Sequence, residues 1–421
     1  MIFFYRILTL ILFPFFVAVI YLRRFKNKED KIRFKEKIFI TKPNFPDKKK
    51  VIWIHAASVG ETNSVIPLIK ELIERNKQIF VLLTTSTFTS SQLIKKKELS
   101  SENFQHNFFP LDVQFLVKKF LNYWRPKLVI FIDSEVWPNY LLEISKREIP
   151  LMLLNGRISM KTFKRWKIIP NLSKKLFSLY DLCLASSKES EKNLKELGVR
   201  KVKFIGNLKF CAVIKDEKGN GVIKSILNDV YVWCAASTHP GEEEMILKTH
   251  SLLKQKGLNI ITIIIPRHIN RSPKILAICN YVKLKSQIIR SHSEILKGTE
   301  ILIINSIGEM SKYFFACRSI FMGKSFSEKL IKVGGQNPIE AAKCGCKIYH
   351  GPYVSNFKEI YSYLNEKKIA FEVSNENDLA DNLLKDIGEV ENFNKKNIQD
   401  LNSFGDKILN LTTEEVLRLT K

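Results

Sequence analysis

The sequence predicts an α/β protein with two doubly wound parallel sheets, one in each half of the chain. Three observations support this fold class. Short apolar runs recur along the chain, stretches with apolar residues at helical spacing separate them, and a charged, glycine-containing stretch interrupts the series near the middle. Buried parallel strands appear as continuous apolar runs because helices cover both faces of the sheet. Alternation of such strands with helices is typical of βαβ units.

The first half of the chain carries the first series of predicted strands. Residues 64–76, "SVIPLIKELIERN", show apolar residues at helical spacing and predict a helix between the first two strands. We expect one Rossmann-like domain over residues 51–214. Its predicted strands are 51–55, 79–85, 128–133, 151–156, 182–186 and 202–205.

The second half begins after the charged stretch "KDEKGNG" at 215–221, which predicts a linker over residues 215–229. A second Rossmann-like domain is expected over residues 230–405, followed by a C-terminal helix over 406–421. Neither half contains a G-x-G-x-x-G fingerprint or a Walker A lysine loop, which excludes those two nucleotide-binding signatures. The predicted strands are 231–237, 259–265, 300–306, 319–323 and 346–351.

The chain opens with the apolar stretch "MIFFYRILTLILFPFFVAVIYLRRF", and residues 7–22 of it carry no charge. A helix that crosses a bilayer needs about 20 such residues, so we expect a transmembrane anchor over residues 1–22. A cleaved signal peptide would need a small-residue cleavage site, which "YLRRFKNK" lacks. A helix lying in the interface would need a polar face. The basic segment over residues 23–50 then places both domains in the cytoplasm.

The formal net charge of +26 comes from 68 Lys and Arg against 42 Asp and Glu. Such an excess favours an anionic partner: nucleic acid, an acidic membrane or a phosphorylated substrate. A general enrichment in Lys along the chain is the alternative explanation. Seven cysteines without a CxxC pair indicate reduced cytosolic thiols, and seven histidines without an HExxH pattern indicate no metal site.

Polar motifs follow the predicted strands, where ligands bind in doubly wound sheets. Because the carboxyl ends of parallel strands share one edge, we expect these motifs to gather at one edge of each sheet. The motifs are "AASVGE", "DSEVWPN", "GRIS", "GNLKF", "STHPGEE", "PRHINR", "NSIGE" and "GGQNPIE".

Several of these motifs carry a resemblance to a known family. The stretches "HAASVGE", "SEVWPN", "GNLKF", "ASTHPGEE", "PRH", "GE" at 308–309, "GGQNPIEAA" and "GPYVSNF" run in family order between about residues 50 and 360. In them the chain resembles the bacterial 3-deoxy-D-manno-octulosonic acid (Kdo) transferases of lipid A assembly.

The resemblance implies a GT-B glycosyltransferase fold, in which two Rossmann-like domains face a cleft behind an N-terminal transmembrane helix. It implies transfer of Kdo from CMP-Kdo to the lipid A precursor lipid IVA, with inversion and without a metal or other cofactor. The implied location is the inner membrane, single-pass, with the catalytic domains on the cytoplasmic face. The other partners would be anionic membrane lipids, and no nucleic acid is expected.

The resemblance assigns three catalytic residues. Glu61 would be the general base that takes a proton from the acceptor hydroxyl; the alternative is an acid that favours the dipole of the following helix. Glu135 would support the oxocarbenium-like transition state, unless it is a structural acid that orients a neighbouring Arg or Lys. Lys209 would stabilise the leaving phosphate, with a surface lysine as the alternative.

The donor site is expected on the second domain, where Arg267 can place two hydrogen-bond donors on phosphate oxygens. Asn337 and Pro338 look like the opening of a helix whose N-terminus faces a phosphate; simple capping by Asn337 and Glu340 is the alternative. The sequence departs from the family pattern at Asp133, Asn305 and Gln336. The expected donor-binding residues are Ser237, Pro266, Arg267, Ile307, Gly308, Glu309, Asn337, Pro338, Ile339 and Glu340.

A single acid after the first strand suffices for this reaction, because CMP leaves as a stabilised phosphate and needs no proton.

Two other functions are compatible with parts of the sequence. Another GT-B nucleotide-sugar enzyme of the cell envelope, a transferase or an epimerase, would keep the fold and change the donor. A membrane-tethered nucleic-acid-binding protein would explain the charge, but no RNP-like or helix-turn-helix signature supports it.

Overall fold

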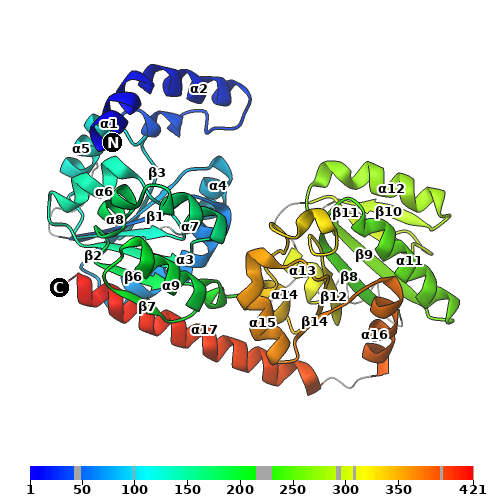
Figure 1. The fold of residues 1–421 in the computed structure, drawn as a ribbon. Coiled ribbons are helices and arrows are strands. Elements are labelled where there is room, and N and C mark those ends of the chain that lie inside the picture. The colour runs from blue at the N-terminus through cyan, green and yellow to red at the C-terminus, as the bar shows by residue number, and fades with distance from the viewer. Residues whose placement is uncertain are drawn as a thin grey trace. The chain divides into compact units, whose positions relative to one another are not determined.

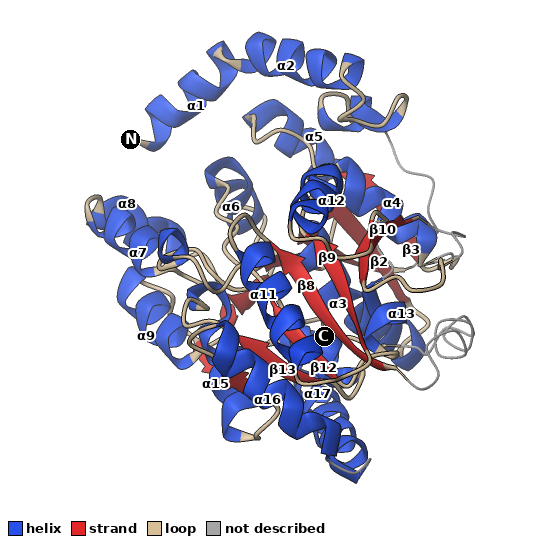
Figure 2. Ribbon diagram, turned by 90° about the vertical axis from the view of Figure 1, so that its right-hand side faces the viewer, coloured by secondary structure: helices blue, strands red, loops and turns tan. Residues whose placement is uncertain are grey.

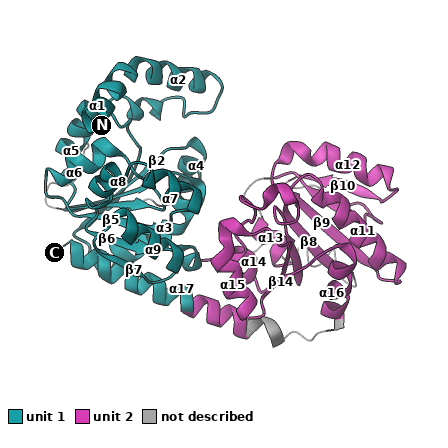
Figure 3. Cartoon of the chain, viewed as in Figure 1, with its two compact units in different colours: residues 1–212, 404–421 teal, residues 213–403 magenta. Residues whose placement is uncertain are grey.

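The computed structural model of the chain describes residues 1–41, 49–97, 99, 101–214, 230–290, 295–306, 310–388 and 392–420. The chain divides into two compact units, which are coloured in Figure 3. Unit 1 comprises residues 1–212 and 404–421, and unit 2 comprises residues 213–403. The expected linker at 215–229 lies outside the described residues.

Unit 1 is built on a sheet of seven parallel strands, visible at its centre in Figure 1. Each strand predicted in residues 51–186 is present. The structure adds β3, whose sequence "FQHNF" is only half-buried and lacks the apolar run that marks an inner strand. The order is β3 (Phe104–Phe108), β2 (Ile79–Thr85), β1 (Lys50–Ala56), β4 (Leu128–Ile132), β5 (Leu151–Gly156), β6 (Leu182–Ala185) and β7 (Val202–Phe204).

Helices of unit 1 connect these strands and bury the sheet. The core centres on Trp53 of β1, which is fully buried and packs against the rings of Phe109, Phe120, Phe131 and Tyr140. The helices are α3 (Val59–Arg75), α4 (Phe88–Lys96), α5 (Gln114–Trp124), α6 (Pro138–Ser145), α7 (Met160–Lys167), α8 (Pro170–Phe177) and α9 (Lys188–Leu197).

The long C-terminal helix α17 (Asn392–Leu419) begins well before residue 406, where the sequence analysis placed the final helix. From residue 404 on it belongs to unit 1. Its Gly405 carbonyl accepts a hydrogen bond from Cys211 Sγ, and Phe404 packs against Phe210. These contacts fasten the middle of the helix to the 3-10 turn Leu208–Cys211 of unit 1.

Unit 2 repeats the architecture with a second sheet of seven parallel strands; Figure 2 shows its strands in red among blue helices. The predicted strands are present, and the short β10 and β14 were not anticipated. The order is β10 (Ser286–Ile289), β11 (Ile301–Ile304), β9 (Ile260–Pro266), β8 (Tyr231–Thr238), β12 (Ser319–Met322), β13 (Lys347–His350) and β14 (Ala370–Glu372). The helices are α11 (Glu242–Gln255), α12 (Ser272–Tyr281), α13 (Met310–Phe314), α14 (Ile339–Lys343), α15 (Lys358–Glu366) and α16 (Glu376–Gly388).

The N-terminal apolar segment forms two helices instead of the single helix expected over residues 1–22. The helices are α1 (Ile2–Ile11) and α2 (Phe13–Phe25), and they are bent by 51° relative to each other. Pro14 lies in the first turn of α2, where its missing N–H is tolerated but a preceding helix cannot continue straight through it. Among the described helices none alone meets the length and apolarity of a membrane span, and this bent pair meets them only together.

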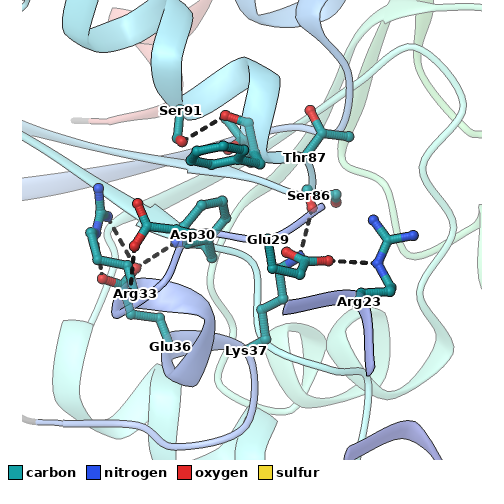
Figure 4. Close-up of polar contacts among 12 residues, drawn as sticks. Arg23, Glu29, Asp30, Arg33, Glu36, Lys37, Ser86, Thr87 and Ser91 are labelled. Atoms are coloured by element: carbon teal, nitrogen blue, oxygen red, sulfur yellow. Dashed lines mark hydrogen bonds and ion pairs between the residues drawn. The ribbon is translucent and has the colours of Figure 1, made fainter. Parts of the chain in front are cut away.

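The basic segment that follows α2 is folded against unit 1 (Figure 4). Lys37 Nζ donates hydrogen bonds to Glu29 Oε2 at 2.6 Å and to the Ser86 carbonyl at 2.9 Å. Arg23 Nε donates to the other oxygen of Glu29 at 2.7 Å, and Arg33 donates to the carbonyl of His106. Because Ser86 directly follows β2, this network ties the segment to the carboxyl edge of the sheet. The described part of segment 23–50 is therefore held in place by specific contacts.

Candidate active site

The carboxyl ends of β1 and β4 lie side by side in unit 1, at the point where the strand order reverses. Glu61 is in the first turn of α3 just beyond β1. Its Oε1 accepts a hydrogen bond from Ser58 Oγ at 2.7 Å, and its Oε2 accepts one from the Ala57 N–H at 2.7 Å. Ser58 is the N-cap of α3, and its Oγ in turn accepts from the Glu61 N–H at 3.3 Å. The capping role is therefore real, and the lone pairs that remain on the carboxylate leave room for a substrate proton.

The surroundings of Glu61 disfavour its ionised form. The pKa of its carboxyl is raised from 4.5 to about 7, first by burial and then by the nearby Asp133, while hydrogen bonds from Ser58 and Ala57 oppose these effects. Glu135 adds a smaller raising effect. A general base is most efficient when its pKa lies near the working pH, so this value suits proton abstraction at neutral pH.

Asp133 and Lys209 meet beside Glu61 although they are far apart in sequence. Lys209 Nζ lies 3.8 Å from Asp133 Oδ2. Asn155, at the end of β5, donates to Asp133 Oδ1 at 2.6 Å and accepts from the Leu208 N–H at 3.0 Å. It therefore links the loop after β4 to the 3-10 turn Leu208–Cys211 that carries Lys209. The sequence analysis missed Asn155; an Asn-Gly pair at the end of a strand was the available signal.

Glu135 is held on three sides by residues of unit 1. Trp137 Nε1 donates to Glu135 Oε2, and Tyr180 OH donates to the Glu135 carbonyl. His55 Nε2 is 3.6 Å from the same Oε2. These contacts come from the side chains of Trp137, Tyr180 and His55.

The expected donor residues at the ends of β8 and β9 are brought together in unit 2. Thr238 pairs with Pro266 across these neighbouring strands, and the Arg267 N–H donates to the Thr238 carbonyl at 3.1 Å. Ser237 is buried and adopts a positive φ of 57°, which is uncommon for a residue other than glycine. The Arg267 side chain is exposed.

The stretch 337–340 forms the start of α14. Asn337 Oδ1 accepts a hydrogen bond from the Ile339 N–H at 3.2 Å, but the N-cap of the helix is Pro338, because the helix begins at Ile339, one residue later than expected. Ile339 is buried within unit 2. Glu340 is half-buried in the first turn. The other expected donor residues, 307–309, lie outside the described residues.

The glycine pair before Asn337 permits a close approach between loops. A Cβ on Gly334 would lie 2.1 Å from the Tyr353 carbonyl oxygen, and Gly335 has a φ of +91°. The structure shows an unusual backbone that packs against residues 353–354.

Glu242 organises the loop after β12 and was not predicted. Its fully buried carboxylate accepts hydrogen bonds from the N–H groups of His239, Lys324, Ser325 and Phe326. One acid therefore fixes the ends of two neighbouring strands in unit 2. The signal was the run of acids "GEEE" at a predicted helix start. Among the described residues, no three His, Cys, Asp or Glu side chains gather in a metal-binding group.

Comparisons with known proteins agree with this geometry. A family profile described as 3-deoxy-D-manno-octulosonic-acid transferase (kdotransferase) matches residues 32–212. The transferase of that name from Rickettsia bellii is 31% identical over 399 residues, which are 94% of this chain and 93% of the relative. The one from Haemophilus influenzae is 31% identical over 415 residues, covering 97% and 94%.

A solved structure supports the fold alone. The UDP-GlcNAc 2-epimerase from Neisseria meningitidis, bound to UDP-GlcNAc, superposes with a TM-score of 0.61 at 14% identity and covers 88% of this chain and all of its own. The two Rossmann-like sheets are therefore of the GT-B type.

Proposed function

Since the chain belongs to the 3-deoxy-D-manno-octulosonic acid transferase family, we propose that it transfers Kdo from CMP-Kdo to lipid IVA during lipopolysaccharide core biosynthesis. The observation that carries the proposal is the carboxyl edge of unit 1. There Glu61, with a pKa raised by burial to about 7, lies among Asp133, Glu135 and Lys209.

In the proposed reaction Glu61 accepts the proton of an acceptor hydroxyl as its oxygen bonds to the anomeric carbon of Kdo. The bond from that carbon to the CMP phosphate breaks, and its electron pair leaves with the phosphate. The attack and departure are on opposite faces, so the anomeric centre inverts. Glu135 supports the positive charge that develops on the sugar.

Cationic and amide groups hold the departing phosphate in this proposal, and no metal takes part. Lys209 and Arg267 supply positive charge, and its attraction to the phosphate is stronger in the transition state than in the ground state, because negative charge develops there. On unit 2, Ser237, Pro266 and residues 307–309 and 337–340 contact the donor. The support is the placement of Ser237 and Arg267 at the ends of adjacent strands.

Incubation of purified protein with CMP-Kdo and lipid IVA, followed by mass spectrometry of the lipid, tests the function. We expect CMP release and a product heavier by whole Kdo units, whose number also becomes known. UDP-sugars serve as the comparison donors. Turnover of a UDP-sugar, with CMP-Kdo left intact, would favour another GT-B enzyme.

The transfer rate is expected to rise as the pH increases through about 7, because Glu61 must lose its proton before it can accept another. Burial favours the protonated carboxyl, so this form dominates below that pH. A pH profile of kcat with purified protein measures the effect. An acidic limb near 4.5, the ordinary value of a Glu carboxyl, would contradict the assigned base.

We propose that the helix pair α1–α2 attaches both units to the cytoplasmic side of the inner membrane. Kdo transferases are generally membrane-associated, and the exposed apolar residues of the pair support this. A single-pass crossing was expected from the sequence, but polar contacts to unit 1 favour a pair that lies within one leaflet. The exposed apolar residues are Phe3, Phe4, Ile7, Leu8, Leu10, Ile11, Phe15, Leu22 and Phe25.

Those polar contacts engage one face of α1. Tyr5 OH donates to Asp112 Oδ2 at 2.7 Å, and Arg6 pairs with Glu143 at 3.4 Å. Thr9 Oγ1 accepts from Asn139 Nδ2 at 3.5 Å. The polar face that an interfacial helix requires is thus present but covered by unit 1, while the opposite face remains apolar. A crossing helix would have to break all three contacts.

Labelling of a single introduced cysteine distinguishes the two topologies. In spheroplasts, Phe3→Cys is expected to be protected from a membrane-impermeant maleimide until the cells are lysed. Ile32→Cys, at a position 79% exposed after α2, is the matched control on the cytoplasmic side in both topologies. Labelling of Phe3→Cys in intact spheroplasts would establish the single crossing instead.

A further inference from the structure

His55 lies at the carboxyl end of β1, directly against Glu135, and has no role in the reaction proposed above. Its side chain is fully buried, and its ring stacks on Phe109 with centroids 3.7 Å apart and an interplanar angle of 22°. The ring cannot turn without disturbing this packing. Its two nitrogens therefore keep distinct partners.

The contacts of His55 Nδ1 favour the tautomer that has a proton on this nitrogen. It lies 3.1 Å from the carbonyl oxygen of Thr84, which can only accept a hydrogen bond. The Thr84 hydroxyl, at 3.0 Å from Nδ1, already accepts from Trp53 Nε1. The carbonyl thus fixes the protonation of this nitrogen, as backbone carbonyls commonly do for buried histidines.

The Nε2 atom faces an acceptor and has no conventional hydrogen-bond partner among the described residues. The nearest carboxylate oxygen is Glu135 Oε2, 3.6 Å away, which also accepts from Trp137. If His55 were neutral with its proton on Nδ1 and Glu135 were ionised, the buried lone pair of Nε2 would face a carboxylate oxygen of Glu135, whose side chain is only 16% exposed. Burial of a polar atom against a second acceptor is costly, because neither group is satisfied.

We propose that His55 Nε2 and Glu135 Oε2 share one proton, so that His55 is the positioning residue of Glu135. The proton belongs either to an imidazolium beside a carboxylate or to a carboxylic acid beside an imidazole. In both forms the pair has no net charge. The effect of the pair on catalysis rests on the proposed function. The presence of the shared proton does not depend on that function.

The pair sets the charge that surrounds the general base. In the described part of unit 1, the acids that act on Glu61 are Asp133 and Glu135, and Lys209 lies beside Asp133. With the proton in place, Glu135 and His55 together add no net charge to this cluster. Loss of His55 would leave Glu135 as a full negative charge, which disfavours the ionisation of Glu61.

Nuclear magnetic resonance of protein labelled with ¹⁵N in its histidines tests the shared proton without any substrate. We expect the Nε2 resonance of His55 to show a protonated or strongly hydrogen-bonded nitrogen over the neutral pH range. In Glu135→Gln the proton is lost and a neutral ring is expected. A bare, unprotonated Nε2 in the unsubstituted protein, unchanged in Glu135→Gln, would overturn the proposal even if transfer is intact.

The pH profile of transfer gives the functional test. In His55→Gln we expect the acidic limb to move upward by about half a pH unit or more, because an additional negative charge faces Glu61. His106→Gln is the matched control: His106 lies in β3 of the same sheet and is hydrogen-bonded to Thr85 Oγ1 at 2.9 Å. A lower kcat with an unmoved limb in His55→Gln would show that His55 only supports the fold, and would overturn its influence on Glu61.

Discussion

Glu61→Gln is expected to reduce Kdo transfer by about 10²–10⁴-fold while CMP-Kdo binding persists, because the amide cannot accept the acceptor's proton. The fold around it should survive. A Gln in this position keeps both contacts, since its oxygen can accept from the Ala57 N–H and its amide can donate to Ser58 Oγ. Steady-state rates and CMP-Kdo titration of the same preparation measure the two effects.

Glu71→Gln is the matched control for this substitution. Glu71 is on the same helix α3, but it pairs with Arg75 at the surface and should be dispensable. Thermal unfolding provides a second check. Since burial raises the pKa of Glu61, its charge opposes folding above about pH 7, so the Gln variant should be at least as stable as the unsubstituted protein there. Unreduced turnover in Glu61→Gln would remove Glu61 from the mechanism.

Lys209→Met is expected to lower kcat by about 10²–10³-fold, because it removes a fixed cation where negative charge develops on the leaving phosphate. The same substitution should shift the acidic limb of the pH profile upward. Without the ammonium 3.8 Å away, Asp133 acts more strongly against the ionisation of Glu61. A lysine that only covers the surface would produce neither effect.

Lys203→Met provides the comparison for Lys209→Met. Lys203 is in β7, close in sequence, and forms an exposed ion pair with Glu415. Exposed pairs of this kind contribute little to stability, so near-normal rates are expected. If Lys209→Met and Lys203→Met both retain full kcat, groups other than Lys209 stabilise the charge on the leaving phosphate.

Most of the two sheets could be predicted because inner strands are continuous apolar runs. The strands that escaped prediction are short or lie near an edge: β3 has three polar residues between its two Phe, and β10 and β14 have only four and three residues. At such positions one face or one edge is solvated, so the sequence carries a weaker signal. The helix start at Ile339 differs by one residue because local capping decides it.

Some residues of the candidate site could also be predicted from the sequence, and others could not. Glu61, Glu135 and Lys209 could be named from motifs. In the structure Glu61 follows β1 and Glu135 follows β4, and these two strands are neighbours in the sheet. Asn155 and His55 could not be assigned a role, because their partners come from strands distant in sequence. The transmembrane expectation was incomplete for a similar reason: hydropathy cannot show that Asp112 and Glu143 engage the polar face of α1.

The path of the chain through α17 constrains how the protein is made. A ribosome completes strands β1–β7 and then all of unit 2 before it releases residues 404–421, which belong to unit 1. Until then the pocket against Gly206 lacks Ile408, whose side chain fills the space where a Cβ would clash. Unit 1 is thus translated first but completes its fold last. The apolar surface that Ile408 covers near Gly206 stays exposed on the nascent chain while unit 2 is synthesised.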